Sequence, residues 1–183
     1  MTMVRNHSRV RPQTRGAVDR DIAHSVFRKH QQKMPVDISG IAKDLGLNIY
    51  EKDLGKISGV LKYDPIMGGE SGYVVYVNEK HPPNRQRFTA AHEIAHFVLH
   101  AKGKDHPDVA TFKIEDDEFY RFLPGPDEWA ANEMAAEILM PWGLIETLRQ
   151  SGVDTLPDMA RKLGVSRQAL AIRLGIPFDQ DWA

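Results

Sequence analysis

The sequence lacks several features, and each absence narrows what the protein can be. None of its 183 residues is cysteine, so disulfide bonds and thiolate metal ligands are excluded. Any bound metal must therefore use histidine and carboxylate side chains. No stretch approaches the roughly 18 apolar residues that a membrane span needs, and the N-terminus lacks the apolar core of a secretion signal. The protein is expected to be cytoplasmic, with no membrane contact.

An excess of charge of one sign is also missing. The chain has 24 Lys and Arg residues against 25 Asp and Glu residues, which gives a formal net charge of -1. No chain-wide positive field therefore draws the protein to nucleic acid, and any such contact would have to be local. Hydrophobic residues make up 42% of the chain, enough for the core of one ordinary globular domain. The oligomeric state is left open.

Three parts are expected along the chain. Residues 1–17 are polar, carry several arginines and have almost nothing to bury, which predicts a disordered basic tail. A nucleic-acid-binding arm is the alternative interpretation of this tail. Residues 18–150 are expected to form the main domain, and residues 151–183 a helical C-terminal segment.

The apolar pattern changes from helical to strand periodicity and back, which predicts an α+β fold. Short β-branched and aromatic stretches separated by turn residues predict a small antiparallel sheet, over residues 48–53, 57–64 and 71–80. Helical spacing and helix boundary residues predict the remaining elements. These helices are expected at 19–32, 35–46, 84–100, 126–140, 142–152 and 156–176, with the last interrupted at Gly164.

One predicted helix carries a metal-binding motif. Residues 89–102 read TAAHEIAHFVLHAK, in which His96 follows His92 by four positions. Such positions share one helix face, so both imidazoles can bind a single ion. Glu93 is turned away by about 100° and is expected to reach a water on the metal, as the general base of a hydrolase does. The surrounding apolar residues favour a buried site, where a metal is a suitable partner for histidine.

His100 continues the same spacing but cannot complete this site. It lies about 12 Å further along the helix axis than His92, whereas a zinc–nitrogen bond is about 2.0–2.1 Å long. Metzincins break this helix at a glycine and use a later histidine, but those positions are Leu99 and Lys102 here. The metzincin class is therefore excluded, and His100 is expected to pack, cap the helix or contact substrate.

A carboxylate on the helix at 126–140 is the alternative third ligand. Glu128 and Asn132 are four residues apart, so if Glu128 binds the metal, Asn132 lies on the same face and can hydrogen-bond a ligating imidazole. Glu133 and Glu137 form a competing pair on another face, where a solvated surface role is more typical. Spacing alone leaves both pairs open, with a preference for Glu128.

These motifs resemble the ImmA/IrrE family of metallopeptidases, which has a gluzincin-like active site. The resemblance spans roughly residues 35–175 and rests on PVDISGIAKDLGL, ISGVL, RQRFTAAHEIAHFVLH, EWAANEMAAEILMP and MARKLGVSRQALAIRL. The chain departs from the family at Ala130, where Glu or Gln is more usual, and at Met134, where Phe is. Neither position is a proposed ligand, but both can alter the packing beside the site.

The resemblance implies a zincin-like metallopeptidase domain over residues 18–150, with Glu128 as the third ligand and Glu93 as the catalytic carboxylate. It also implies a Zn²⁺ ion, or Mn²⁺, since His2Glu sites accept several divalent ions. The implied activity is a site-specific endopeptidase that cleaves a helix-turn-helix repressor encoded nearby. Such cleavage would turn on stress-response or mobile-element genes.

The groups that hold the substrate are less defined. The strand at 71–80 would bind an extended peptide by β-augmentation if it is a sheet edge, or be an ordinary core strand. The residue that stabilises the oxyanion is unassigned, and the candidates are His100, His106, Tyr120 and Arg121.

The C-terminal stretch LPDMARKLGVSRQALAIRLGI supports a rival function. It places small, turn, N-cap and core residues as a helix-turn-helix does, and Arg167, Gln168 and Arg173 are candidates for DNA or partner contacts. The alternative is therefore a DNA-binding regulator with a metal-sensing or inactive peptidase-like domain. However, residues 151–183 balance four basic with four acidic residues, a poor footprint for phosphate. A packing or substrate-docking role is favoured.

A third class is an interaction module with a structural metal. Structural sites are usually closed by four protein ligands, and Glu93 would have no purpose in one. A fourth protein ligand would support this class.

Overall fold

The computed structural model describes residues 19–100 and 125–177. The tail predicted at residues 1–17 lies outside these ranges. Within them, no helix combines the length and the apolar character needed to cross a membrane.

Helices and a small sheet share the described residues, which confirms the α+β class. The predicted helices are present, with ends within a few residues of those expected. In chain order the elements are α1 (Arg20–His30), α2 (Ile38–Asp44), β1 (Leu47–Lys52), β2 (Gly59–Tyr63), β3 (Tyr73–Asn78), α3 (Pro83–His100), α4 (Pro126–Leu139), α5 (Trp142–Gln150), α6 (Leu156–Leu163) and α7 (Arg167–Leu174).

The sheet is mixed, so the prediction of a purely antiparallel sheet is wrong for one of its strand pairs. The strand order is β1-β3-β2, with β2 antiparallel to β3 but β1 parallel to it. After β1 the chain passes to the far edge of the sheet, forms β2, and returns through the middle as β3. A period of two identifies the two faces of a strand but not its neighbours. β3 is therefore a core strand, and the edge-strand interpretation of residues 71–80 is wrong.

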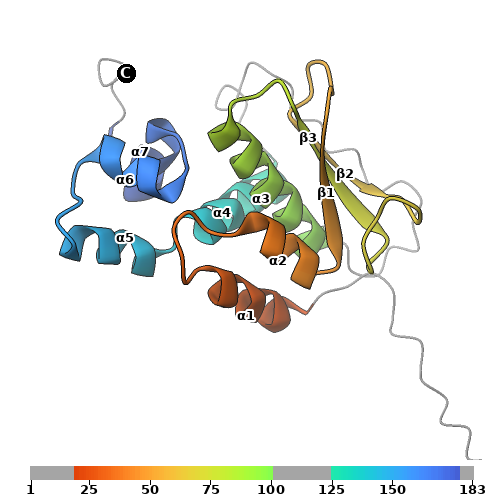
Figure 1. Ribbon diagram of the computed structural model, residues 1–183, viewed down its shortest axis with the longest axis horizontal. Helices are drawn as coiled ribbons and strands as arrows, with labels where there is room; N and C mark the ends of the chain where they lie inside the picture. Colours follow the sequence, from red (N-terminus) through yellow and green to blue (C-terminus); the bar gives the residue numbers. More distant parts are fainter. Residues whose placement is uncertain (1–18, 101–124, 178–183) are drawn as a thin grey trace, which may run out of the picture.

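The centre of the molecule is α3, which packs against β2 and β3 on one side and α4 on the other. Figure 1 shows this layering, with the sheet on the right, α1 and α2 below, and α5, α6 and α7 on the left. α3 is buried continuously from Thr89 to Val98, because it contacts the protein on several sides. Phe97 meets Tyr73 of β3 edge-on, with ring centroids 5.2 Å apart. A helix so enclosed holds its polar side chains in fixed positions.

Short polar residues set the helix ends. Asp37 accepts a hydrogen bond from the Gly40 backbone at the start of α2, and Thr155 and Ser166 cap α6 and α7 in the same way. α6 ends at Gly164, whose φ of 68° lies in the left-handed region that favours glycine. The interruption predicted at Gly164 is therefore present.

Replacing Ser166 with alanine should lower the free energy of unfolding by about 1 kcal/mol. The reason is that Ser166 Oγ accepts a hydrogen bond from the Ala169 backbone at 3.0 Å, and alanine leaves that donor without this partner. Thermal denaturation should show a Tm lowered by about 2–4 °C. Gln168→Ala, at an exposed position of the same helix, is the matched control. Equal Tm changes in the two variants would argue against the cap.

Candidate metal centre

Two histidines of α3 point at one place inside the protein. His92 is 1% exposed and His96 is fully buried. Their Nε2 atoms lie 2.8 Å apart, and the rings are nearly perpendicular, with an interplanar angle of 76°. This is the convergence that the four-residue spacing predicted, and the packing of α3 against the sheet and α4 keeps it away from bulk water.

Glu128 reaches the same place from the first turn of α4. Its Oε2 lies 3.3 Å from His92 Nε2, and its Oε1 lies 3.2 Å from His96 Nε2. Hydrogen bonds from the two histidines hold the pKa of Glu128 well below its usual value, so the carboxylate is ionised. Burial lowers the pKa of His96, which favours the neutral imidazole. Anionic carboxylate and neutral imidazole are the protonation states that bind a metal.

The spacing of these atoms fits a tetrahedral ion. Ligands that are 2.0–2.1 Å from a tetrahedral centre are about 3.3 to 3.4 Å from one another. The two distances from Glu128 match this value, and the histidine nitrogens are about half an ångström closer. Within the described residues, His92, His96 and Glu128 are the group of donors that come together in this way.

Asn132 supports the cluster from one turn along α4. Its Oδ1 lies 2.9 Å from His92 Nδ1. If the ring donates its proton here, the lone pair of Nε2 is left facing the cluster. The position predicted for Asn132 beside an imidazole is therefore the one it occupies.

Glu93 lies beside the cluster but takes no part in it. Its side chain is fully buried, and neither carboxylate oxygen makes a well-formed hydrogen bond within the described residues. Burial raises the pKa of Glu93 well above its usual value, and repulsion from Glu128 adds to this, while the nearby Leu61 backbone N–H acts in the opposite sense. A buried carboxyl with so little compensation costs stability, which is typical of a group kept for its chemistry.

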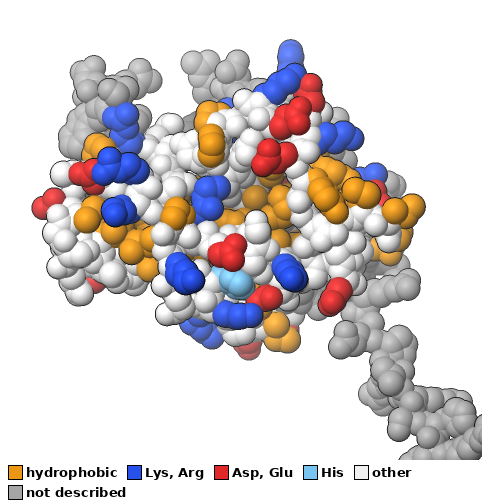
Figure 2. All heavy atoms as spheres, in the orientation of Figure 1, with side chains coloured by type: hydrophobic (Ala, Val, Ile, Leu, Met, Phe, Trp, Pro, Cys, Tyr) orange, Lys and Arg blue, Asp and Glu red, His pale blue; other side chains and the backbone are white. Residues whose placement is uncertain are grey.

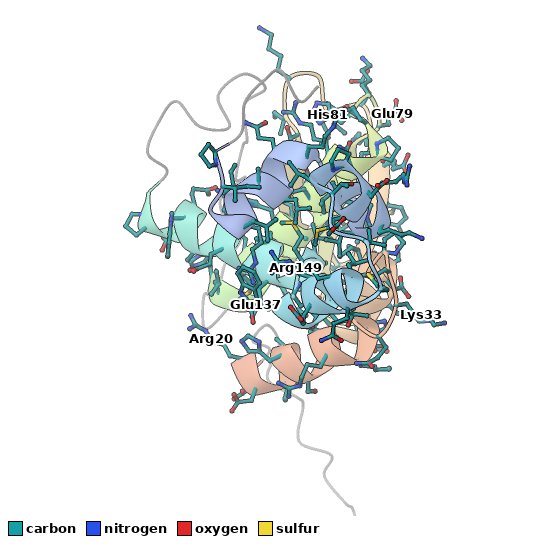
Figure 3. All side chains as sticks on the ribbon, turned by 90° about the vertical axis from the view of Figure 1, so that its left-hand side faces the viewer. Arg20, Lys33, Glu79, His81, Glu137 and Arg149 are labelled. Atoms are coloured by element: carbon teal, nitrogen blue, oxygen red, sulfur yellow. The ribbon has the colours of Figure 1, made fainter. Side chains whose placement is uncertain are left out.

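The other predicted residues do not join the cluster. The His100 ring centroid lies 5.4 Å from that of His96, and His100 is absent from the group of converging donors, as its distance along the helix predicted. Glu133 and Glu137 are exposed on α4, and Figure 3 labels Glu137. Glu137 pairs with His24 of α1 at 3.9 Å. The remaining candidates, His106, Tyr120 and Arg121, lie outside the described residues.

The C-terminal candidates lie on α7 and have different surroundings. Gln168 is exposed and Arg167 is half-buried. Arg173 Nε donates a hydrogen bond to the Met140 carbonyl at 3.2 Å, and its guanidinium stacks 5.0 Å from the centre of the Trp142 ring. Arg173 therefore links α7 to the end of α4 and the start of α5.

One feature of the site could not be found from the sequence. Gly59 and Leu61 of β2 lie against Glu93, although they precede it by more than thirty residues. No motif marks them, because their place depends on which strand forms the sheet edge next to α3.

Comparison with known proteins identifies the family of the chain. Residues 42–175 match the profile of a peptidase family described as the IrrE N-terminal-like domain. The chain is also similar to Metallopeptidase ImmA of Bacillus subtilis (strain 168), with 28% identity over 153 residues, which is 84% of this chain and 75% of that protein. Both α3 and α4 fall inside the matched region. The resemblance found in the sequence is thus confirmed, and the chain belongs to the ImmA/IrrE family of metallopeptidases.

Proposed function

We propose that the protein is a zinc-dependent endopeptidase in which His92, His96 and Glu128 bind the metal and Glu93 is the general base. The observation that carries the proposal is the convergence of two imidazoles and one carboxylate beside a buried carboxyl that makes no well-formed hydrogen bond within the described residues. Three protein donors leave a coordination position for water or substrate, as catalytic zinc sites do. Mn²⁺ is an alternative ion for the same ligands.

When bound, a divalent ion supplies Lewis-acid chemistry, since it acidifies water and polarises the carbonyl of a peptide bond. The side chains of the protein supply proton transfer and orientation. Glu93 takes a proton from the attacking water and passes it to the leaving amine. Burial raises the pKa of Glu93, and a carboxylate with a raised pKa is a stronger base toward the attacking water. Asn132 fixes the orientation of the His92 ring.

Asn132→Ala is expected to weaken zinc binding about 10- to 100-fold without abolishing it. The variant removes the hydrogen bond that orients His92, but it leaves all three ligands in place. Competition with a chromophoric chelator measures the affinity. Glu133→Ala is the matched control, as an exposed residue next to Asn132 on the same helix. Unchanged affinity in Asn132→Ala would remove Asn132 from the site.

The edge of β2 away from β3, where no strand of residues 19–100 and 125–177 pairs with it, is the place where an extended substrate would bind. The Asn78 backbone donates to Ser58, and that of Asp64 donates to Gly72, so alternate residues of β2 pair with β3. The backbone groups of Gly59, Leu61 and Tyr63 therefore point away from β3. A peptide added as another strand would meet these groups beside Glu93, with main-chain hydrogen bonds giving affinity. β2 thus replaces β3 as the proposed β-augmentation strand.

The proposed substrate is a helix-turn-helix repressor encoded near the gene for this protein, and the proposed setting is the cytoplasm. Its cleavage would derepress stress-response or mobile-element genes. This part rests on family membership and not on the geometry of the site.

Cleavage assays test the function directly. Zinc-loaded protein is incubated with the repressor encoded beside its gene, and separately with a peptide library prepared from the proteome of the same organism. Mass spectrometry should find one internal bond of the repressor cut, and no cutting by Glu93→Gln or after chelation. Absence of any product from either substrate by fully metal-loaded protein would overturn the proposal.

The helices α6 and α7 are proposed to pack against the catalytic part or to dock the substrate. Their buried residues, including Leu163 and Leu170, belong to the same core cluster as those of α3 and α4. Arg173 is already bound within the protein. Figure 2 shows basic and acidic side chains interspersed on the face that it draws, without a continuous basic stripe.

A gel-shift assay tests the rival function. We expect no retardation of duplex DNA at low salt, because residues 151–183 carry as many acidic as basic residues and Arg173 is used for packing. Binding that weakens steeply as salt is titrated would instead favour the DNA-binding regulator. A control with Arg167→Ala and Gln168→Ala would then locate the contacts.

A further inference from the structure

Gly59 lies in a strand and not in a turn, and it lies against the buried Glu93. Gly59 begins β2, is buried, and its φ does not fall in the positive range that favours glycine. Its backbone conformation is therefore open to any residue. What excludes other residues is space, since a Cβ added here would overlap Thr89 Cγ2 and lie 3.1 Å from Glu93 Oε1.

Thr89 and Glu93 lie four residues apart on α3, so both side chains project from one helix face toward β2. Thr89 is 1% exposed, and its hydroxyl has no hydrogen-bond partner within the described residues. Thr89 therefore contributes to the contact between α3 and β2, here called the seam, mainly by the shape of its side chain. With hydrogen in place of a side chain at Gly59, α3 approaches β2 closely enough for the Glu93 carboxyl to lie beside the Leu61 backbone N–H.

We propose that Gly59 and Thr89 are positioning residues, whose contact sets the distance of the Glu93 carboxyl from the edge of β2 where the substrate is held. The inference rests on the proposed function of Glu93 and deepens it. The contact sets the separation of α3 and β2, and therefore the place of the general base. We expect a change in it to affect kcat more than KM. A displacement of about 1 Å in a reacting group is enough to cost on the order of 10²-fold in rate.

Kinetics of three variants test the seam, with a fluorogenic peptide that spans the library bond cleaved fastest. Gly59→Ala should lower kcat about 10²-fold, with KM and zinc content near the wild-type values. Adding Thr89→Ser removes the Cγ2 atom that the new Cβ would meet, so kcat should recover by about tenfold or more. Thr89→Ser alone is the reference against which the double variant is compared. Gly143→Ala is the matched control, because a Cβ there has no neighbour within 4 Å.

An unchanged kcat in folded Gly59→Ala would overturn the inference, and so would a loss that Thr89→Ser leaves uncorrected. If Gly59→Ala does not fold, the Gly59→Ala/Thr89→Ser variant decides. A folded double variant with kcat within about tenfold of wild type supports the inference, and any larger loss overturns it.

A second measurement separates this inference from the proposed function. In the wild type, Glu93→Gln should shift the NMR signal of the Leu61 amide, since the two groups are neighbours. That shift should shrink in the Gly59→Ala background and return with Thr89→Ser. If the wild type shows this NMR pattern but has no peptidase activity, the proposed endopeptidase function is refuted, while the positioning role of Gly59 and Thr89 stands. An unaltered Leu61 response in Gly59→Ala would refute the positioning alone.

Discussion

Glu93→Gln is expected to lower kcat by about 10³-fold, within the range of general acid–base catalysis, while zinc stays bound at the wild-type level. Glutamine has nearly the same shape as glutamate but cannot accept the proton from water. The zinc content is unaffected because Glu93 lies outside the group formed by His92, His96 and Glu128. Steady-state cleavage of the repressor and elemental analysis of the same preparation measure the two quantities.

The matched control for this variant is Glu133→Gln, which makes the same chemical change at an exposed position of α4. Its kcat should equal that of the wild type. Full activity in Glu93→Gln would rule out Glu93 as the general base. A loss of zinc together with activity would instead make Glu93 part of the metal site.

Glu128→Ala should lose more than about 100-fold in zinc affinity. Removing a side chain that only hydrogen-bonds a metal ligand already costs about 10- to 100-fold in affinity, and Glu128 is a proposed ligand itself. Glu128 supplies the anionic donor of the cluster, and its two oxygens contact both histidines. Without Glu128, the imidazoles of His92 and His96, whose Nε2 atoms are 2.8 Å apart, are left as two neutral donors without the anionic one. Zinc titration monitored by calorimetry gives the affinity, and peptidase activity at ordinary zinc concentrations should disappear.

Asp127→Ala is the control for Glu128→Ala, since Asp127 is an exposed acid in the same first turn of α4. It should bind zinc as the wild type does. Full zinc occupancy in Glu128→Ala would move the third ligand elsewhere in the chain. The two results together distinguish a specific ligand from a general effect of negative charge near the helix start.

The sequence predicted the convergence of His92, His96 and Glu128, because the relative positions of side chains on one helix obey local rules. His92 and His96 lie on one helix, where a separation of four residues fixes their relative direction. Glu128 and Asn132 follow the same rule on α4, and their contacts with the histidines agree with the predicted faces. The rejection of His100 also came from helix geometry alone, and the structure agrees.

The sheet was predicted less well, for an equally physical reason. Alternation along residues 71–80 indicates a strand, but it cannot tell a central strand from an edge, because pairing joins residues distant in sequence. β3 is central and β2 is an edge, so the strand proposed for substrate binding changed. The parallel pairing of β1 with β3 was missed for the same reason.

The sequence by itself determined that this is a cysteine-free α+β chain with a two-histidine helix, a Glu128-bearing helix downstream and an acid at Glu93. Those properties depend on residue chemistry and on the helical repeat, both of which act within a few residues. Only the tertiary structure decided that Gly59 and Leu61 lie against Glu93, and that Arg173 is bound to Met140. These contacts arise when separate elements pack in three dimensions, and packing distances are not encoded in any single stretch of the chain.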